Sequence, residues 1–475
     1  MEQHNYNKQH TLNDLISEYE AMSQKKAVVF YEETAFSYLI EYYQKEKNYD
    51  LALSVVEMAL TQHNFSARLY YKKAELLFLY YHDANFMEDA MHALEEAEKL
   101  SPSDLDILLL KVELLGRAGN HLEAFSLLST LRNELYRPDP HQLANIYYLE
   151  GLLHEGLKDY DSMFKVWRKA LLLNTRHTNI LNKIWLCVEW GQKHQESILL
   201  FEDIIDEDPY CHLAWFYLGN ALVYFGRYKE AIDAYEYAFI IDNQFEWAYK
   251  ECAAICLVLK DYSKALECYE EALKFVLADA DLLFEIGQCY QLLGNLPVAL
   301  DFYSKALDIE DYNDEIFYAI GQCMLQQENF IDAVFYFSKA ADLDGRREEY
   351  FAGLGEAFYL MKNYEEFAEN FVIATELAPE QANIWLQYAT CLFRLGEIER
   401  SLEVLDDAEL HSFGEELLYC RVACLEHLGK HTEAIEVLAE ALQDNPAIHE
   451  MLYDYIPNLA SKRRYLVVID YFMGE

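Results

Sequence analysis

The sequence predicts an all-α fold in which helix pairs stack on one another as an α-solenoid. The first observation is a repeat of 34 residues, along which glycine, alanine and aromatic columns recur. The glycines are Gly219, Gly287, Gly321 and Gly355, and the first alanines are Ala231, Ala265, Ala299 and Ala333. The aromatic column holds Tyr235, Tyr269, Tyr303 and Phe337, and the second alanines are Ala238, Ala272, Ala306, Ala340 and Ala374. A fixed period of this length is typical of stacked supersecondary units and excludes a single globular core.

The second observation is helical spacing within each period. In the block that begins at His212, apolar and small residues recur at i, i+3, i+4 and i+7, which places them on one helical face: Trp215, Leu218, Gly219 and Leu222. A turn at Gly226 follows, and a second helical face then appears: Ala231, Tyr235 and Ala238. Each repeat is therefore expected to be an antiparallel helix pair, with small residues where the two helices approach closely.

Taken in order along the chain, the pattern predicts three segments. Residues 1–32 form a polar tail and a capping helix over residues 12–23, residues 33–448 form the tandem array, and residues 449–475 form a C-terminal cap or degenerate half-repeat. About twelve repeats are expected, starting at Glu33, Ala67, Leu105, Ala144, Thr178, His212, Glu246, Ala280, Asp314, Glu348, Ala382 and Glu415. Longer connections are expected at residues 80–86 and 135–141, the second of which contains Pro138 and Pro140.

One family resemblance follows from these columns. The spacing W-x₂-L-G followed by A-x₃-Y-x₂-A resembles the tetratricopeptide repeat, and Pro209 and Pro379 match its terminal proline. The chain is similar to multi-repeat tetratricopeptide proteins of bacterial type. The resemblance implies a right-handed superhelix whose first helices line a concave groove that contacts an extended peptide.

Composition limits the classes of partner. The chain carries 38 Lys and Arg against 82 Asp and Glu, a formal net charge of −44, and an acidic surface of this size is repelled by nucleic acid and anionic membranes. A basic protein or peptide is the favoured partner, although net charge also simply keeps a protein soluble. No window reaches the ~18 apolar residues of a membrane span, and residues 1–10 do not resemble a secretory signal, so we expect a cytoplasmic protein.

No residue pattern for catalysis, a metal or a cofactor stands out. There is no phosphate-binding glycine loop and no HExxH motif. His427 and His431 are expected to be surface histidines. The ten cysteines are expected to be structural, and five of them share one column of the repeat: Cys187, Cys289, Cys323, Cys391 and Cys424. Lys462, Arg463 and Arg464 form one basic run, interpreted as a solvated turn. The sequence therefore predicts a protein that is not an enzyme.

The candidate binding residues come from two columns of the first helices, which the resemblance places in the groove. They are Glu41, Glu75, Glu113, Asn182, Phe216, Asn220, Lys250, Phe284, Gln288, Tyr318, Gln322 and Glu356. The N-terminal carboxylates suit Lys or Arg, and the central amides suit a peptide backbone because an amide both donates and accepts hydrogen bonds. Some relatives grip a C-terminal carboxylate with Lys, Asn and Arg, but Phe284 and Glu285 leave that clamp incomplete here.

The leading hypothesis is a non-catalytic scaffold or adaptor that binds an extended peptide or protein segment along its concave groove. The alternatives are a self-associating assembly element and, less favoured, a regulatory arm of an enzyme. The sequence does not identify the partner, the pathway, the oligomeric state or the curvature of the superhelix. It leaves open whether the groove, the convex face or the ends carry the binding.

Overall fold

The computed structural model describes residues 14–20, 30–80, 84–133 and 139–473, and within these ranges the regular elements are all helices. Contacts divide the chain into two compact units, 1–248 and 249–475, with the boundary inside helix α15 (Glu246–Val258). Parts of the predicted capping helix and of the two predicted long connections, at residues 12–13, 21–23, 81–83 and 135–138, lie outside the described residues.

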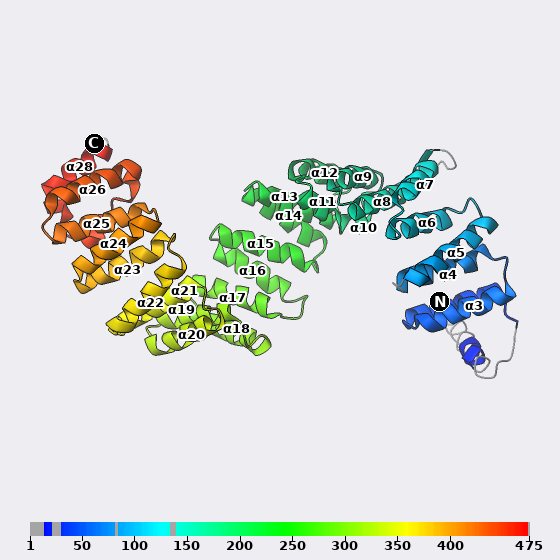
Figure 1. The fold of residues 1–475 in the computed structure, drawn as a ribbon, viewed down its shortest axis with the longest axis horizontal. Coiled ribbons are helices and arrows are strands. Elements are labelled where there is room, and N and C mark those ends of the chain that lie inside the picture. The colour runs from blue at the N-terminus through cyan, green and yellow to red at the C-terminus, as the bar shows by residue number, and fades with distance from the viewer. Residues whose placement is uncertain (1–13, 21–29, 81–83, 134–138, 474–475) are drawn as a thin grey trace. The chain divides into compact units, whose positions relative to one another are not determined.

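The described residues of the first unit form six successive helix pairs (Figure 1). Five of them are regular: α2 (Glu33–Lys45) with α3 (Tyr49–Gln62), α4 (Ala67–Tyr80) with α5 (Ala84–Leu100), α6 (Leu105–Arg117) with α7 (His121–Asn133), α8 (Pro140–Gly156) with α9 (Tyr160–Leu173), and α13 (His212–Tyr224) with α14 (Tyr228–Ile241). The fifth pair in chain order has a divided first helix, α10 (Thr178–Leu181) and α11 (Ile184–Trp190), before α12 (His194–Glu207).

The second unit continues the same arrangement through six more pairs. They are α15 with α16 (Tyr262–Ala272), α17 (Ala280–Leu292) with α18 (Leu296–Ile309), α19 (Asp314–Gln326) with α20 (Phe330–Leu343), α21 (Glu348–Leu360) with α22 (Tyr364–Leu377), α23 (Ala382–Leu395) with α24 (Ile398–His411), and α25 (Glu415–His427) with α26 (His431–Asp444). The array is followed by η1 (Pro446–Ile448), α27 (Met451–Tyr455), η2 (Leu459–Ser461) and α28 (Arg463–Met473).

These pairs confirm the predicted all-α fold of repeated helix pairs. Eleven of the twelve predicted start residues are the first residues of helices, and the fourth repeat is the exception. Its first helix begins at Pro140 and not at Ala144, because Asp139 and Gln142 form a capping box with backbone–side-chain distances of 2.8 and 3.1 Å. Pro140, expected in a connecting segment, occupies the first helical turn, where a missing N–H costs nothing.

A glycine–aromatic contact holds the two helices of several repeats together. A Cβ atom built on Gly219, Gly287 or Gly321 would lie 2.5–2.6 Å from the ring of the aromatic residue sixteen positions later. Those rings belong to Tyr235, Tyr303 and Phe337, all buried. Only glycine allows the aromatic ring of the second helix to lie directly on the backbone of the first.

Each described turn between paired helices contains one residue in the left-handed region. Five of these residues are glycines, which adopt this conformation without strain: Gly119, Gly226, Gly294, Gly396 and Gly429. The others are Lys47, Lys158, Gln192, Lys260, Glu328 and Lys362. The turn geometry is therefore conserved across the array even where its preferred residue type is not.

Helices outside the array cover both of its ends. Residues 14–20 are helical, and Tyr19 packs on Tyr43 of α2 with ring centroids 6.2 Å apart. At the other end, Tyr465 of α28 is fully buried against the last pair. The carboxylate of Glu426 on α25 joins the two, since Tyr465 donates a hydrogen bond to it at 2.5 Å. Such caps cover the apolar face that a terminal repeat exposes.

Candidate peptide-binding surface

The glycine–aromatic contact also sets the direction of the neighbouring side chains. The glycine faces the second helix of its own repeat, and successive residues of an α-helix are about 100° apart, so the residue after the glycine is turned away from that contact. The residues of interest therefore share one side of the first helices, which we call the first-helix face.

In the second unit, the first-helix face contains a cleft of about 500 Å³ formed by α17, α19, α21 and α23. We call it the amide cleft, because six side-chain amides line it: Gln291, Gln322, Gln326, Gln381, Asn383 and Gln387. Three residues from the predicted set, Tyr318, Gln322 and Glu356, also line it. Sequence reasoning found Gln322 but missed the other five amides, which lie outside the two columns that were followed.

A hydrogen-bond chain orients two of these amides. The hydroxyl of Tyr303 donates to Oε1 of Gln291 at 2.7 Å, and Nε2 of Gln291 donates to Oε1 of Gln322 at 3.3 Å. Each of these bonds uses one end of an amide, and the side chain of Gln322 also hydrogen-bonds with the Tyr318 hydroxyl. Tyr303, whose ring is buried, thus orients the side chains of Gln291 and Gln322 in the cleft.

Tyr318 and Glu356 give the cleft a rigid aromatic wall and a negative charge. The half-buried ring of Tyr318 lies between Phe337 and Tyr350, at centroid distances of 5.5 and 5.0 Å. Burial raises the pKa of the Tyr318 hydroxyl, which remains a neutral donor. Glu356 is open to solvent, yet desolvation by the surrounding walls raises the pKa of its carboxyl.

Other predicted residues of the second unit lie beside the amide cleft without lining it. Phe284 is half-buried against Tyr303, with centroids 5.6 Å apart, and Gln288 is half-buried on the same helix. Lys250 lies 3.6 Å from the carboxylate of Asp279.

In the first unit, two predicted contacts are used by the fold itself. Phe216 is buried, with its ring 5.8 Å from Tyr235 and 5.1 Å from Phe245, which corrects the expectation of an open aromatic contact. Asn220 accepts a 2.8 Å hydrogen bond from the Tyr235 hydroxyl, so its side-chain carbonyl is engaged within the repeat.

Asn182 and Glu75 also differ from expectation. Asn182 is exposed in the break between α10 and α11 and not within a continuous first helix. Glu75 already forms an ion pair with Lys72 at 2.5 Å, which reduces its value as a free anionic contact. Glu41 is exposed on α2.

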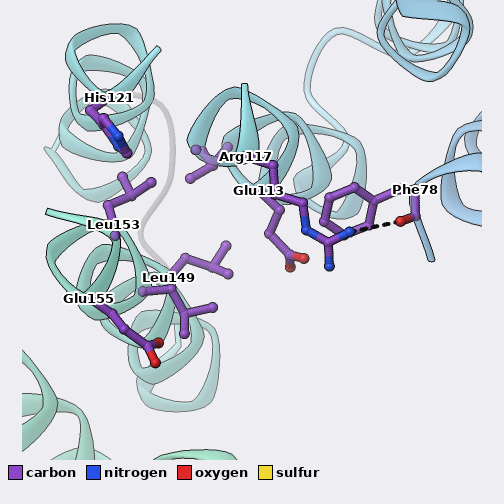
Figure 2. Close-up of a pocket in the computed structure, with 11 residues that line it drawn as sticks. Phe78, Glu113, Arg117, His121, Leu149, Leu153 and Glu155 are labelled. Atoms are coloured by element: carbon purple, nitrogen blue, oxygen red, sulfur yellow. Dashed lines mark hydrogen bonds between the residues drawn. The ribbon is translucent and has the colours of Figure 1, made fainter. Parts of the chain in front are cut away.

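Glu113 of α6 lies between two cavities of the first unit. One, of about 260 Å³, is lined by Tyr71, Glu75 and Asp106 as well as Glu113. The other, of about 340 Å³, is shown in Figure 2, with Glu113 on α6 and Glu155 on α8 around a group of leucines. Desolvation raises the pKa of Glu113, and the nearby charge of Arg117 opposes that shift. The sequence pointed to Glu113 but not to Glu155 or the leucine walls.

The described residues contain neither a metal-binding cluster nor a candidate membrane span. No group of three or more His, Cys, Asp or Glu side chains in this part of the chain is arranged to hold a metal ion. Within the same residues, no helix combines the length and the apolar character that crossing a bilayer needs.

Comparison with known proteins adds a family match. A tetratricopeptide repeat family model matches residues 191–244 and 257–314. Anaphase-promoting complex subunit 3 of Schizosaccharomyces pombe is 23% identical over 145 residues, which cover 30% of this chain and 22% of that protein. The chain therefore matches only about a fifth of the length of this curated relative.

Solved structures of low similarity were also found. The Cut9–Hcn1 hetero-tetramer of the anaphase-promoting complex gives 13% identity and a TM-score of 0.39, over 80% of this chain and 93% of that chain. YrrB, described as a protein with an unusual peptide-binding site, gives 20% identity and a TM-score of 0.34, over 39% and 95% of the two chains. MamA gives 15% identity and a TM-score of 0.32, over 34% and 94%.

Proposed function

The chain is a tetratricopeptide repeat protein, and we propose that it is a non-catalytic scaffold that binds an extended peptide or protein segment on its first-helix faces. Arrays of this kind offer long binding surfaces built from many equivalent positions. The affinity would come from many modest contacts in which a few rigid aromatic side chains dominate.

The observation that carries the proposal is the amide cleft of the second unit. An extended peptide presents alternating N–H and C=O groups, and amide side chains satisfy both kinds. The hydrogen bonds from Tyr303 to Gln291 and from Gln291 to Gln322 hold two amides in place before a ligand arrives, which lowers the entropy lost on binding. Tyr318 adds a fixed aromatic surface next to them.

The charge of the chain favours a basic segment and disfavours nucleic acid, since the formal net charge is −44. Glu348, Glu349 and Glu356 bring carboxylates to the amide cleft itself. All ten cysteines are free thiols, and nine of them are buried. A reducing compartment maintains that state, so we place the protein in the cytoplasm.

The test is selection of peptides from a random 12-residue phage library on the full chain, followed by fluorescence anisotropy with the selected peptides. The substituted protein would carry Gln322→Ala and Gln387→Ala. Two lost hydrogen bonds should weaken binding by roughly tenfold or more. Basic peptides should also bind more weakly as salt increases.

Gln443→Ala provides the matched control, because Gln443 is an exposed amide near the end of α26 and does not line the cleft. It should bind as the unsubstituted chain does, with equal helicity by circular dichroism. Selection of no peptide, or equal affinity of the selected peptides for the double variant, would refute the amide cleft as the binding site.

A further inference from the structure

The cavity in Figure 2 combines apolar walls with acidic groups, and we call it the Glu113 pocket. Its volume of about 340 Å³ is at the small end of the range for ligand pockets, which suits one side chain better than a whole cofactor. Leu149 and Leu153 of α8 provide apolar walls, and Glu113 of α6 and Glu155 of α8 provide the carboxylates.

The cationic residue already at this pocket is held by other groups. The guanidinium of Arg117 lies 3.7 Å above the ring of Phe78, and its Nη1 donates to the Phe78 carbonyl at 2.9 Å, drawn as a dashed line in Figure 2. Arg117 therefore influences Glu113 through its charge without forming a salt bridge to it.

The two carboxylates differ in their partners. Glu155 accepts hydrogen bonds from Nζ of Lys183 at 3.0 and 3.2 Å. Glu113 has no hydrogen bond or salt bridge to any residue in the described ranges, although it is half-buried. An unpaired carboxylate with reduced solvation is costly, and an incoming cation would offset that cost. The Nδ1 atom of His121, also in the wall, is buried and lacks a hydrogen-bond partner among the described residues.

We propose that the Glu113 pocket takes the side chain of a lysine from a partner protein, with its aliphatic stem against Leu149 and Leu153 and its ammonium group at Glu113. This subsite deepens the proposed function and rests on it, since the lysine would belong to the segment bound on the first-helix faces. It lies in the first unit, on residues that take no part in the amide cleft.

The chemistry of the walls selects lysine over other residues. An acidic side chain would meet Glu113 and Glu155, and an aliphatic one would desolvate Glu113 further without pairing it. A lysine has a four-carbon stem for the leucines and a compact charge for a single carboxylate. Arginine also pairs well with a carboxylate, but its guanidinium is larger than an ammonium group, and the Arg117 guanidinium already lies near Glu113.

The experiment is disulfide tethering in the full chain, which needs no knowledge of the partner. Leu152→Cys places a thiol in the lining of the pocket. The protein is equilibrated, in the presence of a reducing thiol, with aminoalkyl, alkyl, carboxyalkyl and guanidinoalkyl disulfides of two to six carbons. Intact mass spectrometry measures the labelled fraction, and the unsubstituted chain gives the background from its own thiols.

We expect an aminoalkyl probe to exceed the alkyl probe of equal length by about tenfold at its best length. Adding Glu113→Gln should abolish this preference, whereas Glu123→Gln, an exposed position on α7, should leave it intact. A thiol at Ser129, exposed on α7, reports the attraction of amines to the acidic surface in general and should show a much smaller preference.

Equal labelling by alkyl and aminoalkyl probes at every length would overturn the proposal, as would a preference that survives Glu113→Gln. A stronger preference for the guanidinoalkyl probe would assign arginine instead. If Leu152→Cys fails to fold, Gly156→Cys replaces it, because a Cβ atom there lies 3.4 Å from its nearest neighbour, Cε1 of His121. Failure at this pocket leaves peptide binding at the amide cleft unaffected, so the two proposals fail separately.

Discussion

The hydroxyl of Tyr455 lies 2.9 Å from the hydroxyl of Thr390, although 65 residues separate them. Tyr455 ends α27, beyond the last repeat, and Thr390 is on α23, the first helix of the eleventh repeat. Tyr455 also lines a cavity of about 280 Å³ together with Glu356 and Arg394. The C-terminal cap therefore reaches the first-helix face of the second unit.

The Tyr455–Thr390 bond should be measurable as a coupling energy. Tyr455→Phe and Thr390→Val are each expected to lower the free energy of unfolding by about 1 kcal/mol, since each removes one side of the hydrogen bond. The double variant should lose little more than either single variant. Urea denaturation followed by circular dichroism gives the three values, and strictly additive losses would mean that the bond is not formed.

A second prediction concerns Glu426, whose side chain is only 4% exposed. Burial alone would raise the pKa of this carboxyl, but hydrogen bonds from Lys462, Tyr465, His431 and Arg464 lower it to about 2. The basic run expected to be a solvated turn thus supplies two partners of a buried acid. Glu426→Gln should destabilise the chain by roughly 2 kcal/mol.

The control is Glu433→Gln, an exposed partner of Lys430 that should change stability by less than about 0.5 kcal/mol. The effect of Glu426 also has a defined pH dependence. Its pKa is lower in the folded state, so its stabilisation is present above about 4.5 and is lost as pH falls towards about 2. The stability difference between Glu426→Gln and the unsubstituted chain should shrink across that interval, and a constant difference would contradict this account.

The glycine–aromatic contact gives a third prediction. Gly321→Ala would place a Cβ atom 2.6 Å from the Phe337 ring, and the resulting overpacking should cost roughly 2 kcal/mol. Gly345→Ala is the matched substitution, because its new Cβ atom would lie 3.4 Å from the nearest atom, the Ala341 carbonyl oxygen. Thermal unfolding should separate the two variants by several degrees, and equal melting temperatures would show that the ring moves aside freely.

The ionised carboxylate of Glu285 should lower the free energy of unfolding at neutral pH. Desolvation raises the pKa of its carboxyl, against a weak 3.4 Å hydrogen bond from Tyr269. A carboxyl that binds its proton more tightly in the folded state destabilises the fold as pH rises through its pKa. Glu285→Gln should therefore raise the free energy of unfolding at pH 7, by on the order of 0.5 kcal/mol.

That gain should shrink as pH falls below the ordinary pKa of 4.5, where the carboxyl of Glu285 becomes protonated in both states. Glu267→Gln, at an exposed position on α16, should show no comparable gain. Urea titrations at pH 7 and pH 4 provide the measurement, and a gain of equal size at both values would rule out ionisation as its cause.

The periodicity located almost every helix because small and aromatic residues must recur where helices touch. It misplaced the start of α8, where the capping box of Asp139 and Gln142 extends the helix towards the N-terminus. The binding surface was harder to predict. A column marks which residues face one side, but it does not show that Phe216 is covered by Tyr235 and Phe245.

Two of the amides that sequence reasoning missed could have been found by including more positions of each first helix. Gln291 lies three residues after Gln288. Thr390 has the column position of Gln288 three periods later, and Gln387 lies three residues before it, so both amides are helical neighbours of a column that was followed. The Glu113 pocket had no such signal, because its walls come from α6, α7 and α8 and depend on how these helices pack.

The glycine and the aromatic residue that lock a helix pair belong to the same repeat and are sixteen positions apart in every case described. Each repeat therefore contains both residues of the contact that holds its helix pair together. A gene that gains or loses one whole repeat still encodes helix pairs with this contact intact. Gain or loss of a fraction of a copy would separate the two residues. Lengthening by whole modules is thus the evolutionary step that this architecture tolerates, and it would extend the surface offered to a ligand without redesigning any existing pair.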